Sequence, residues 1–248
     1  EMFSAVLKTY YCMKEGIKPE DLYVVSVIPC TAKKFEATRD ELGYYTDAAL
    51  TTRELAKMIR EAGLDFANLP ESQFDDPFGE ASGGGAIFGA TGGVMEAALR
   101  VAARTLGDAD EPIVFDEVRG TKGIKEATYT LGGVTVNVAV ASGLGNARKV
   151  IEDIKSGKKK YTFVEIMACP GGCINGGGQP YIHDEVRNNM DLKTLRATAL
   201  YDSDRYNKYR LSDEPPAIKT LYKEFFGEPN GHKAHELLHT HYQPRPMY

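Results

Sequence analysis

Two of the four cysteines lie in a glycine-rich run. Cys169 and Cys173 are spaced C-x3-C within Glu165–Pro180, EIMACPGGCINGGGQP, a run that contains five glycines. No Asp, Glu, Lys or Arg lies between Glu165 and Asp184, although 26% of the chain is charged. Glycine lets backbone approach a bound group closely, and successive N–H groups can cradle an anion. Thiolates beside so much exposed N–H favour a negatively charged iron–sulfur cluster over a zinc ion.

A third cysteine, Cys30, follows the short apolar run Tyr23–Ile28, YVVSVI, and Pro29. A continuous β-branched run of this length predicts a buried, parallel strand. Tyr161–Ala168 predicts another strand, which delivers Cys169 at its end. Open α/β sheets place their ligands at the carboxyl ends of strands. Both cysteine sites therefore occupy the same kind of place, a strand terminus.

Four cysteines are needed to hold a 4Fe–4S cluster, and this pattern offers three. Either Cys12 is the fourth ligand, or Cys12 is an ordinary residue of the first helix and the fourth ligand lies outside this sequence. For Cys30 the alternative is a buried structural thiol, because free cysteine packs as a small hydrophobe. That alternative is weaker for Cys169 and Cys173, because core packing needs no glycine run and the intervening Pro-Gly-Gly disfavours a helix.

The composition excludes several classes of protein. The net charge of −5 gives no reason to expect a nucleic-acid partner. No run of about eighteen apolar residues predicts a membrane span, and no secretory signal opens the chain. Four cysteines among 248 residues do not make a disulfide scaffold, so the C-x3-C loop indicates a metal site in a reducing compartment, the cytoplasm.

The remaining elements predict an α/β fold. A capping box at Thr51–Glu54 begins a helix whose apolar stripe runs to Gly63, and the glycine-rich Ser82–Gly93 leads into the helix VMEAALRVAARTL. Further helices are predicted at 2–13 (ended by Gly16), from about 147 to 157, at 216–226 and at 233–239, and further strands at 113–118 and 134–141.

Three motifs resemble other kinds of site. His235–His239, HELLH, matches the H-E-x-x-H zinc-protease pattern, but only His241 and a few residues follow, so a docking helix is the preferred interpretation. Gly143–Arg148 follows a strand but lacks the third glycine of a dinucleotide fingerprint, which favours a plain strand-to-helix turn. Ser82–Gly93 lacks the Gly-Lys-Ser/Thr of a P-loop, so its glycines predict tight backbone packing beside a cofactor.

Longer segments resemble one known family. Val27–Glu36, VIPCTAKKFE, resembles the second signature of the iron-only (FeFe) hydrogenases, and Glu165–Pro180 resembles the third. Thr51–Met58, Gly85–Arg100 and His232–His239 are also similar to that family. The resemblance covers essentially the whole chain. It implies a two-lobed α/β catalytic domain, with mainly parallel sheets flanked by helices and a cluster in the crevice between the lobes.

The resemblance implies an H-cluster, which is a 4Fe–4S cubane joined through one cysteine sulfur to a diiron unit with CO, CN and a bridging azadithiolate. Cys30 and Cys169 would ligate the cubane, and Cys173 would ligate it and bridge to the diiron unit. Lys33 would donate a charge-assisted hydrogen bond to an iron-bound cyanide, with Glu36 orienting it. Met167 and Phe88 would wall the diiron pocket and exclude water and oxygen.

The implied activity is that of an oxidoreductase, the reversible conversion of H2 to two protons and two electrons. Electrons would pass to ferredoxin, or to an iron–sulfur or nicotinamide-linked subunit. The alternatives are a non-catalytic hydrogenase-like iron–sulfur protein for cluster assembly, and an H2 sensor. Because assembly proteins usually lose the diiron-pocket residues, the presence of Lys33, Phe88 and Met167 favours the enzyme.

Two departures from the family pattern bear on these expectations. The first signature, which carries the fourth cubane cysteine, does not occur here, and Ile28 stands where a methionine is usual. The chain begins with Glu1-Met2 inside a predicted helix. We therefore expect residues 1–248 to be the larger C-terminal part of one catalytic domain, with a docking tail from about 228 to 248. An upstream segment would supply the fourth cysteine.

Overall fold

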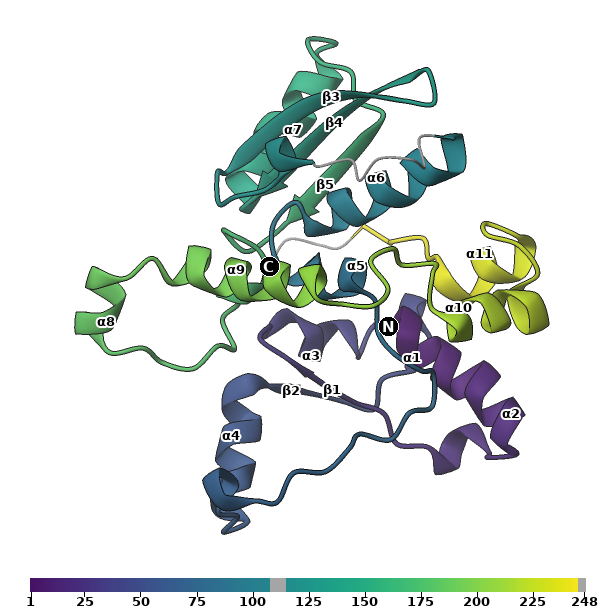
Figure 1. Cartoon of the computed structure of the whole chain (residues 1–248), viewed down its shortest axis with the longest axis vertical. Coiled ribbons are helices and arrows are strands. Elements are labelled where there is room, and N and C mark those ends of the chain that lie inside the picture. The colour runs from purple at the N-terminus through teal and green to yellow at the C-terminus, as the bar shows by residue number, and fades with distance from the viewer. Residues whose placement is uncertain (108–114, 245–248) are drawn as a thin grey trace. The chain divides into compact units, whose positions relative to one another are not determined.

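The computed structural model describes residues 1–107 and 115–244 (Figure 1). The chain forms two compact units. Unit 1 consists of Glu1–Gly79, Gly177–Pro180 and Pro216–Tyr248, and unit 2 of Glu80–Gly176 and Tyr181–Pro215. Unit 1 thus includes the last residues of the glycine-rich run that follows Cys173.

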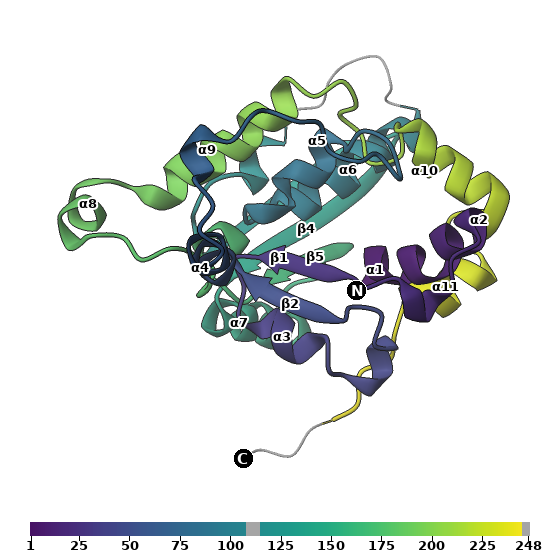
Figure 2. The same cartoon turned by 90° about the horizontal axis from the view of Figure 1, so that it is seen from below.

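Unit 1 contains a cluster of helices from both ends of the chain. The predicted first helix is confirmed as α1 (Met2–Val6), a π-helical turn and α2 (Cys12–Glu15), and it ends at Gly16 with φ of 67°. The predicted C-terminal helices are confirmed as α10 (Pro216–Leu221), a second π-helical turn and α11 (His232–Leu238). Figure 2 shows α1, α2, α10 and α11 gathered together. Their shared core contains Val6, Tyr10, Leu221, Phe226 and Ala234. Cys12 lies on α2 and is 2% exposed.

Unit 1 also contains a two-stranded parallel sheet of β1 (Val25–Ile28) and β2 (Ala48–Thr51). The predicted parallel strand is therefore confirmed, but its predicted burial is wrong, because Val25 and Val27 are 44% and 48% exposed. The β-branched run reflects strand preference, which does not by itself require cover on both faces.

One helix follows each strand of this sheet in the chain. The short α3 (Ala32–Glu36) follows β1 and was not predicted, because five residues show no clear helical period. The predicted capping box is confirmed, since the Thr51 side chain accepts from the Glu54 N–H and Glu54 bonds back to Thr51. It begins α4 (Thr52–Glu61).

Unit 2 is built on a three-stranded sheet in the order β3 (Ile124–Leu131), β4 (Val134–Ser142), β5 (Phe163–Met167). β4 pairs antiparallel with β3 and parallel with β5. The helices α6 (Gly93–Leu106) and α7 (Leu144–Lys155) cover its two faces (Figure 1). β4 alternates accordingly: Val138 and Val140 pack with α6 side chains, and Ala139 and Ala141 pack with α7.

The predicted strands β4 and β5 are confirmed, as are the helices of residues 93–106 and 144–155. β3 was missed, although Gly132-Gly133 after it is a typical two-residue hairpin turn, with φ of 54° and 80°. The strand predicted at 113–118 is wrong where it is described: Asp116–Val118 is a 3-10 turn, and residues 113 and 114 lie outside the described ranges. Phe115 and Val118 fill the core without strand pairing.

Three further helices complete unit 2. They are α5 (Gly83–Ala86), α8 (Asp184–Asn189) and α9 (Leu192–Arg205). The predicted α/β class is confirmed, with two parallel strand pairings and one antiparallel. Among residues 1–107 and 115–244, no helix has the length and apolar character that crossing a bilayer would require.

Candidate functional site

In unit 1, the second signature folds as strand, thiol and helix. β1 ends at Ile28, and the half-buried free thiol of Cys30 comes two residues later, before α3 begins. Lys33 and Glu36 lie one helical turn apart on α3 and form an ion pair. If Glu36 orients Lys33, this ion pair is the contact through which it would do so.

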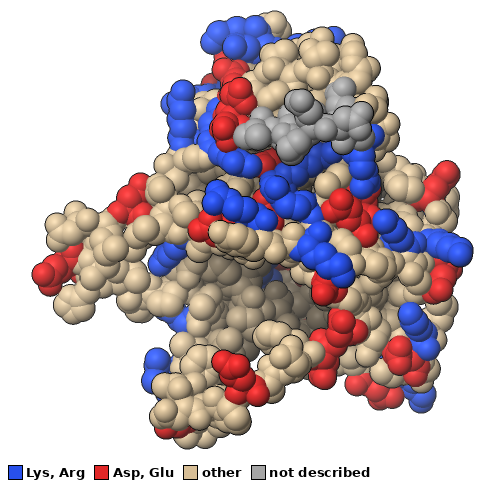
Figure 3. Space-filling view, viewed as in Figure 1, with Lys and Arg blue, Asp and Glu red and all other residues tan. Residues whose placement is uncertain are grey.

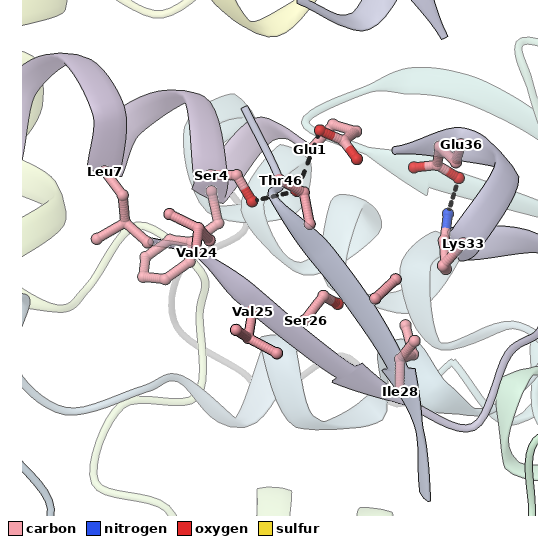
Figure 4. Close-up of a pocket in the computed structure, with 12 residues that line it drawn as sticks. Glu1, Ser4, Leu7, Val24, Val25, Ser26, Ile28, Lys33, Glu36 and Thr46 are labelled. Atoms are coloured by element: carbon pink, nitrogen blue, oxygen red, sulfur yellow. Dashed lines mark hydrogen bonds and ion pairs between the residues drawn. The ribbon is translucent and has the colours of Figure 1, made fainter. Parts of the chain in front are cut away.

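Lys33 and Glu36 border a cavity of about 240 Å³ in unit 1 (Figure 4). The other lining side chains are mainly apolar residues of α1, β1 and the turns beside them, among them Leu7, Val24, Val25 and Ile28. Ser4 and Thr46 also line this cavity, and their hydroxyl groups are hydrogen-bonded at 2.7 Å (Figure 4). The same two charged residues also border a larger cavity of about 690 Å³ beside the end of α11. Lys33 is therefore a cation presented to a cavity.

The last residues of the third signature pack against the second signature inside unit 1. The N–H of Gly178 donates to the carbonyl of Pro29 at 3.2 Å. A Cβ added at Gly178 would lie 2.8 Å from the Thr51 side chain, so only glycine fits there. Gly177 lies against Thr31, the residue after Cys30. The two signatures therefore meet next to Cys30.

In unit 2, β5 ends at Met167 and delivers Cys169 and Cys173 into a tight loop. Gly172 has φ of 101°, and a Cβ added there would lie 2.6 Å from the nitrogen of Thr91. The N–H of Thr91 in turn donates to the carbonyl of Gly171 at 3.1 Å. The C-x3-C loop thus rests on the backbone of the glycine-rich run before α6, as its composition suggested.

The two pocket-wall candidates of unit 2 flank this loop in sequence and space. Met167 is the half-buried last residue of β5. Phe88 lies in the 3-10 turn before α6 and is 42% exposed. That turn contacts the turn beginning at Cys173, since a Cβ added at Gly89 would lie 3.5 Å from Ile174. Unit 2 therefore brings Phe88, Met167 and both cysteines to one end of β5.

Two buried charged residues bind the segment before α6 on which the C-x3-C loop rests. The sequence analysis singled out neither of them. Glu165 lies on β5 and is 6% exposed. Its carboxylate accepts hydrogen bonds from the N–H of Gly92 at 2.7 Å and from the N–H of Met95 at 2.8 Å. A carboxylate there satisfies orphan N–H groups and opposes the positive end of α6. Lys125 on β3 donates to the carbonyls of Thr91 at 2.8 Å and Gly120 at 2.9 Å.

Burial lowers the pKa of Lys125 to about 8, and the Glu165 carboxylate counteracts this shift only in part. The available signal in the sequence was Glu165 itself, a carboxylate inside a predicted strand at the edge of an uncharged run. A strand position gives no information about which helix terminus a side chain will meet.

A second buried network connects α6 to α9. Glu96 is fully buried and accepts from Arg100 and Arg119. Asp204, 1% exposed, accepts two bonds each from Arg100 and Arg210. Burial raises the pKa of Asp204, but the hydrogen bonds from the two guanidinium groups outweigh it and hold that pKa below its usual value. Other Lys and Arg side chains lie beside acidic ones over α6 and α9 (Figure 3).

Residues beside this network also anchor the start of the Ser82–Gly93 segment. The N–H groups of Gly83 and Gly84 donate to the carbonyls of Tyr209 and Arg210 at 2.7 and 3.0 Å. The predicted tight packing of Ser82–Gly93 is therefore confirmed.

By donor chemistry, the three signature cysteines fit an iron–sulfur cluster. All three are half-buried cysteines that follow a strand end, and thiolates are the usual ligands of such clusters. Unit 1 supplies one of them and unit 2 supplies two. In the part of the chain that the structure describes, no three His, Cys, Asp or Glu side chains form a metal-binding group by themselves. That applies to the H-E-x-x-H motif too, where the rings of His235 and His239 contact each other at 4.3 Å between centroids.

Two family profiles match the chain in succession. Residues 1–177 match the iron only hydrogenase large subunit, C-terminal domain, and residues 190–245 match the iron hydrogenase small subunit. Iron hydrogenase 1 of Clostridium pasteurianum is 45% identical over 248 residues, which cover 98% of this chain and 43% of that protein. Protein NAR1 of Arabidopsis thaliana is 32% identical over 266 residues, which cover 98% of this chain and 55% of that protein.

A solved structure is similar over nearly the whole chain. It is a variant of FeFe-hydrogenase HydA1 from Chlamydomonas reinhardtii, with a TM-score of 0.79, 41% identity, and coverage of 97% of this chain and 68% of that one. The present chain spans less than half the length of the clostridial hydrogenase. The expected hydrogenase fold is confirmed by this similarity. The chain belongs to the iron-only hydrogenase family, and it joins the C-terminal domain of the large subunit to a small-subunit segment.

Proposed function

We propose that the protein takes part in the reversible oxidation of H2 to two protons and two electrons. Ferredoxin, or an iron–sulfur or nicotinamide-linked subunit, would exchange the electrons, and the reaction would take place in the cytoplasm. The observation that carries the proposal is the arrangement after β1, where the Cys30 thiol is followed by a lysine that faces a cavity and is paired with Glu36. A purely structural cysteine would need no paired lysine three residues after it in the sequence.

In this proposal, Cys30 and Cys169 would hold the cubane of an H-cluster, and Cys173 would hold both the cubane and the diiron unit. An upstream segment would supply the fourth thiolate. When bound, the cluster, with its CO, CN and azadithiolate ligands, would supply the cleavage of H2 and the transfer of electrons. Support comes from the last glycines of the third signature, because Gly177 lies against Thr31, the residue after Cys30.

The remaining candidate residues bind and shield. The Lys33 ammonium would donate to an anionic diatomic ligand, a charge-assisted bond that orients and tunes a metal centre. Glu36 would hold the ammonium in place through the ion pair described above. Phe88 and Met167 would exclude water, which strengthens electrostatic interactions in the pocket.

The second candidate function is iron–sulfur cluster assembly, which the similarity to Protein NAR1 keeps in view. The presence of Lys33, Phe88 and Met167 favours the enzyme over this alternative. An H2 sensor with the full cluster would use the same residues as the enzyme and would differ from it in turnover.

Infrared spectroscopy of the matured holoprotein tests the proposal. We expect carbonyl and cyanide bands in the wild-type protein and their loss in Cys173→Ser, because a serine oxygen is a poor bridge between two iron sites. A wild-type protein without these bands after maturation would exclude the hydrogenase and leave cluster assembly. Bands with H2-dependent turnover would exclude the assembly function, and bands without turnover would indicate a sensor.

One lysine on α3 and one on α4 give a matched test of the site. Lys33→Met should shift the cyanide bands or reduce diiron retention, because the donor is lost. Lys57→Met is the control, since Lys57 is exposed and pairs with Glu61 of its own helix at 3.5 Å. Unchanged bands and turnover in Lys33→Met would contradict the assigned role.

A further inference from the structure

Arg53 stands at an unfavourable position for a basic residue. It is the second residue of α4, in the first turn, where the helix dipole repels a cation. Helix formation alone therefore gives no reason for an arginine here. The contacts of Arg53 provide a reason, because Arg53 binds the last glycines of the third signature, Glu165–Pro180.

Both the side chain and the backbone of Arg53 bind this run. The guanidinium Nη2 donates to the carbonyl of Gly177 at 2.8 Å, and the backbone N–H donates to the carbonyl of Gly178 at 3.3 Å. On its other side, Gly178 donates to the carbonyl of Pro29. Arg53 thus presses two consecutive peptides of the third signature against the second signature, and all of these residues belong to unit 1.

The start of α4 is itself held firmly. Glu54 closes the capping box with Thr51 and also pairs with Lys34 of α3. Hydrogen bonds from Lys34 and Thr51 lower the pKa of Glu54 to about 2, so its carboxylate stays charged near neutral pH. A fixed helix start gives Arg53 a defined position from which to hold the run.

We infer that Arg53 is a positioning residue for the backbone that presents the Cys30 thiolate. It holds Gly177 and Gly178, and Gly178 in turn bonds the carbonyl of Pro29, the residue before Cys30. The inference rests on the proposed function, because it concerns a ligand of the proposed cubane. It adds a residue outside both cysteine signatures to that site.

The test compares Arg53→Met with Arg60→Met in the holoprotein. Arg60 lies exposed on the last turn of the same helix, and its side chain contacts no described residue in a hydrogen bond or ion pair. In cluster-free protein, hydrogen exchange of the Gly178 amide should be about fivefold to tenfold faster in Arg53→Met. In loaded protein, retention of the cubane against an iron chelator should be about tenfold weaker in Arg53→Met, with shifted electron paramagnetic resonance g-values. Arg60→Met should match the wild type in each.

Two results would overturn the inference: unchanged Gly178 exchange in Arg53→Met, or faster exchange with an unchanged cubane spectrum and retention. Both leave the proposed function intact, because the wild-type protein is loaded in each. A wild-type protein that takes up no cubane refutes the proposed function and the inference together. Equal melting temperatures of the two variants, within about 2 °C, exclude general unfolding as the cause of any difference.

Discussion

Glu165→Gln is the substitution that best tests how unit 2 supports the cysteine loop. The change keeps the size of the side chain but replaces one carboxylate oxygen with an NH2 group. Because the two oxygens each accept from a different N–H, of Gly92 and of Met95, one of these buried donors would then face another donor. The negative charge at the start of α6 is lost at the same time.

The expected cost follows from these contacts. A hydrogen bond to a buried charged group contributes about 1.5–3 kcal/mol. A charge at a partly buried helix terminus contributes up to about 2 kcal/mol, and this overlaps with the hydrogen bonds rather than adding fully to them. We therefore expect Glu165→Gln to lower the free energy of unfolding by about 2–4 kcal/mol.

Urea denaturation followed by circular dichroism measures this change, and hydrogen exchange at Gly92 and Met95 localises it. Glu152→Gln is the matched control, because Glu152 lies on α7, which covers the same sheet, with its side chain exposed. We expect that control to change stability by less than about 0.5 kcal/mol. A loss below about 1 kcal/mol in Glu165→Gln would refute the reasoning that the carboxylate caps α6 in solution. If Glu165→Gln loses the expected stability but retains the cubane as well as the wild type does, Glu165 does not support the cysteine loop.

Three further predictions concern unit 2. Asp204→Ala should cost about 3–5 kcal/mol in urea denaturation, because it leaves the Arg100 guanidinium buried with one carboxylate fewer; a cost near zero would contradict the network. Lys125 has a folded pKa of about 8, below its unfolded value, so its burial penalty is complete below about pH 8 and is relieved as pH rises. Relative to Lys125→Met, wild-type stability should therefore increase by about 2 kcal/mol from about pH 7 to about pH 9.5, and a parallel pH profile would exclude the shift. Gly172→Ala should lower cubane retention, because its Cβ would strike the Gly89–Thr91 backbone; full retention would show that the loop has room.

Local chemistry made much of this protein predictable. The Thr51–Glu54 capping box, Gly16 at a helix end and the β-branched alternation of β4 act within a few residues, so the corresponding elements were placed correctly. The same is true of the two strand ends that deliver Cys30 and Cys169. Weak local signals explain the omissions: α3 is five residues long, and the helix α9 has little amphipathic character.

What the sequence determined by itself is the inventory of the candidate site. Thiols, glycines with a required conformation and a lysine beside Cys30 are properties of short segments, and they stand in an order that resembles one family. Partners distant in sequence were decided only by the tertiary structure. Glu165 meets α6, Arg53 meets Gly177 and Asp204 meets Arg100 because folding brings together groups that are 70 to 124 residues apart. Charges and polar groups removed from water must find partners wherever the packed chain places them, and no local pattern specifies which partner that will be.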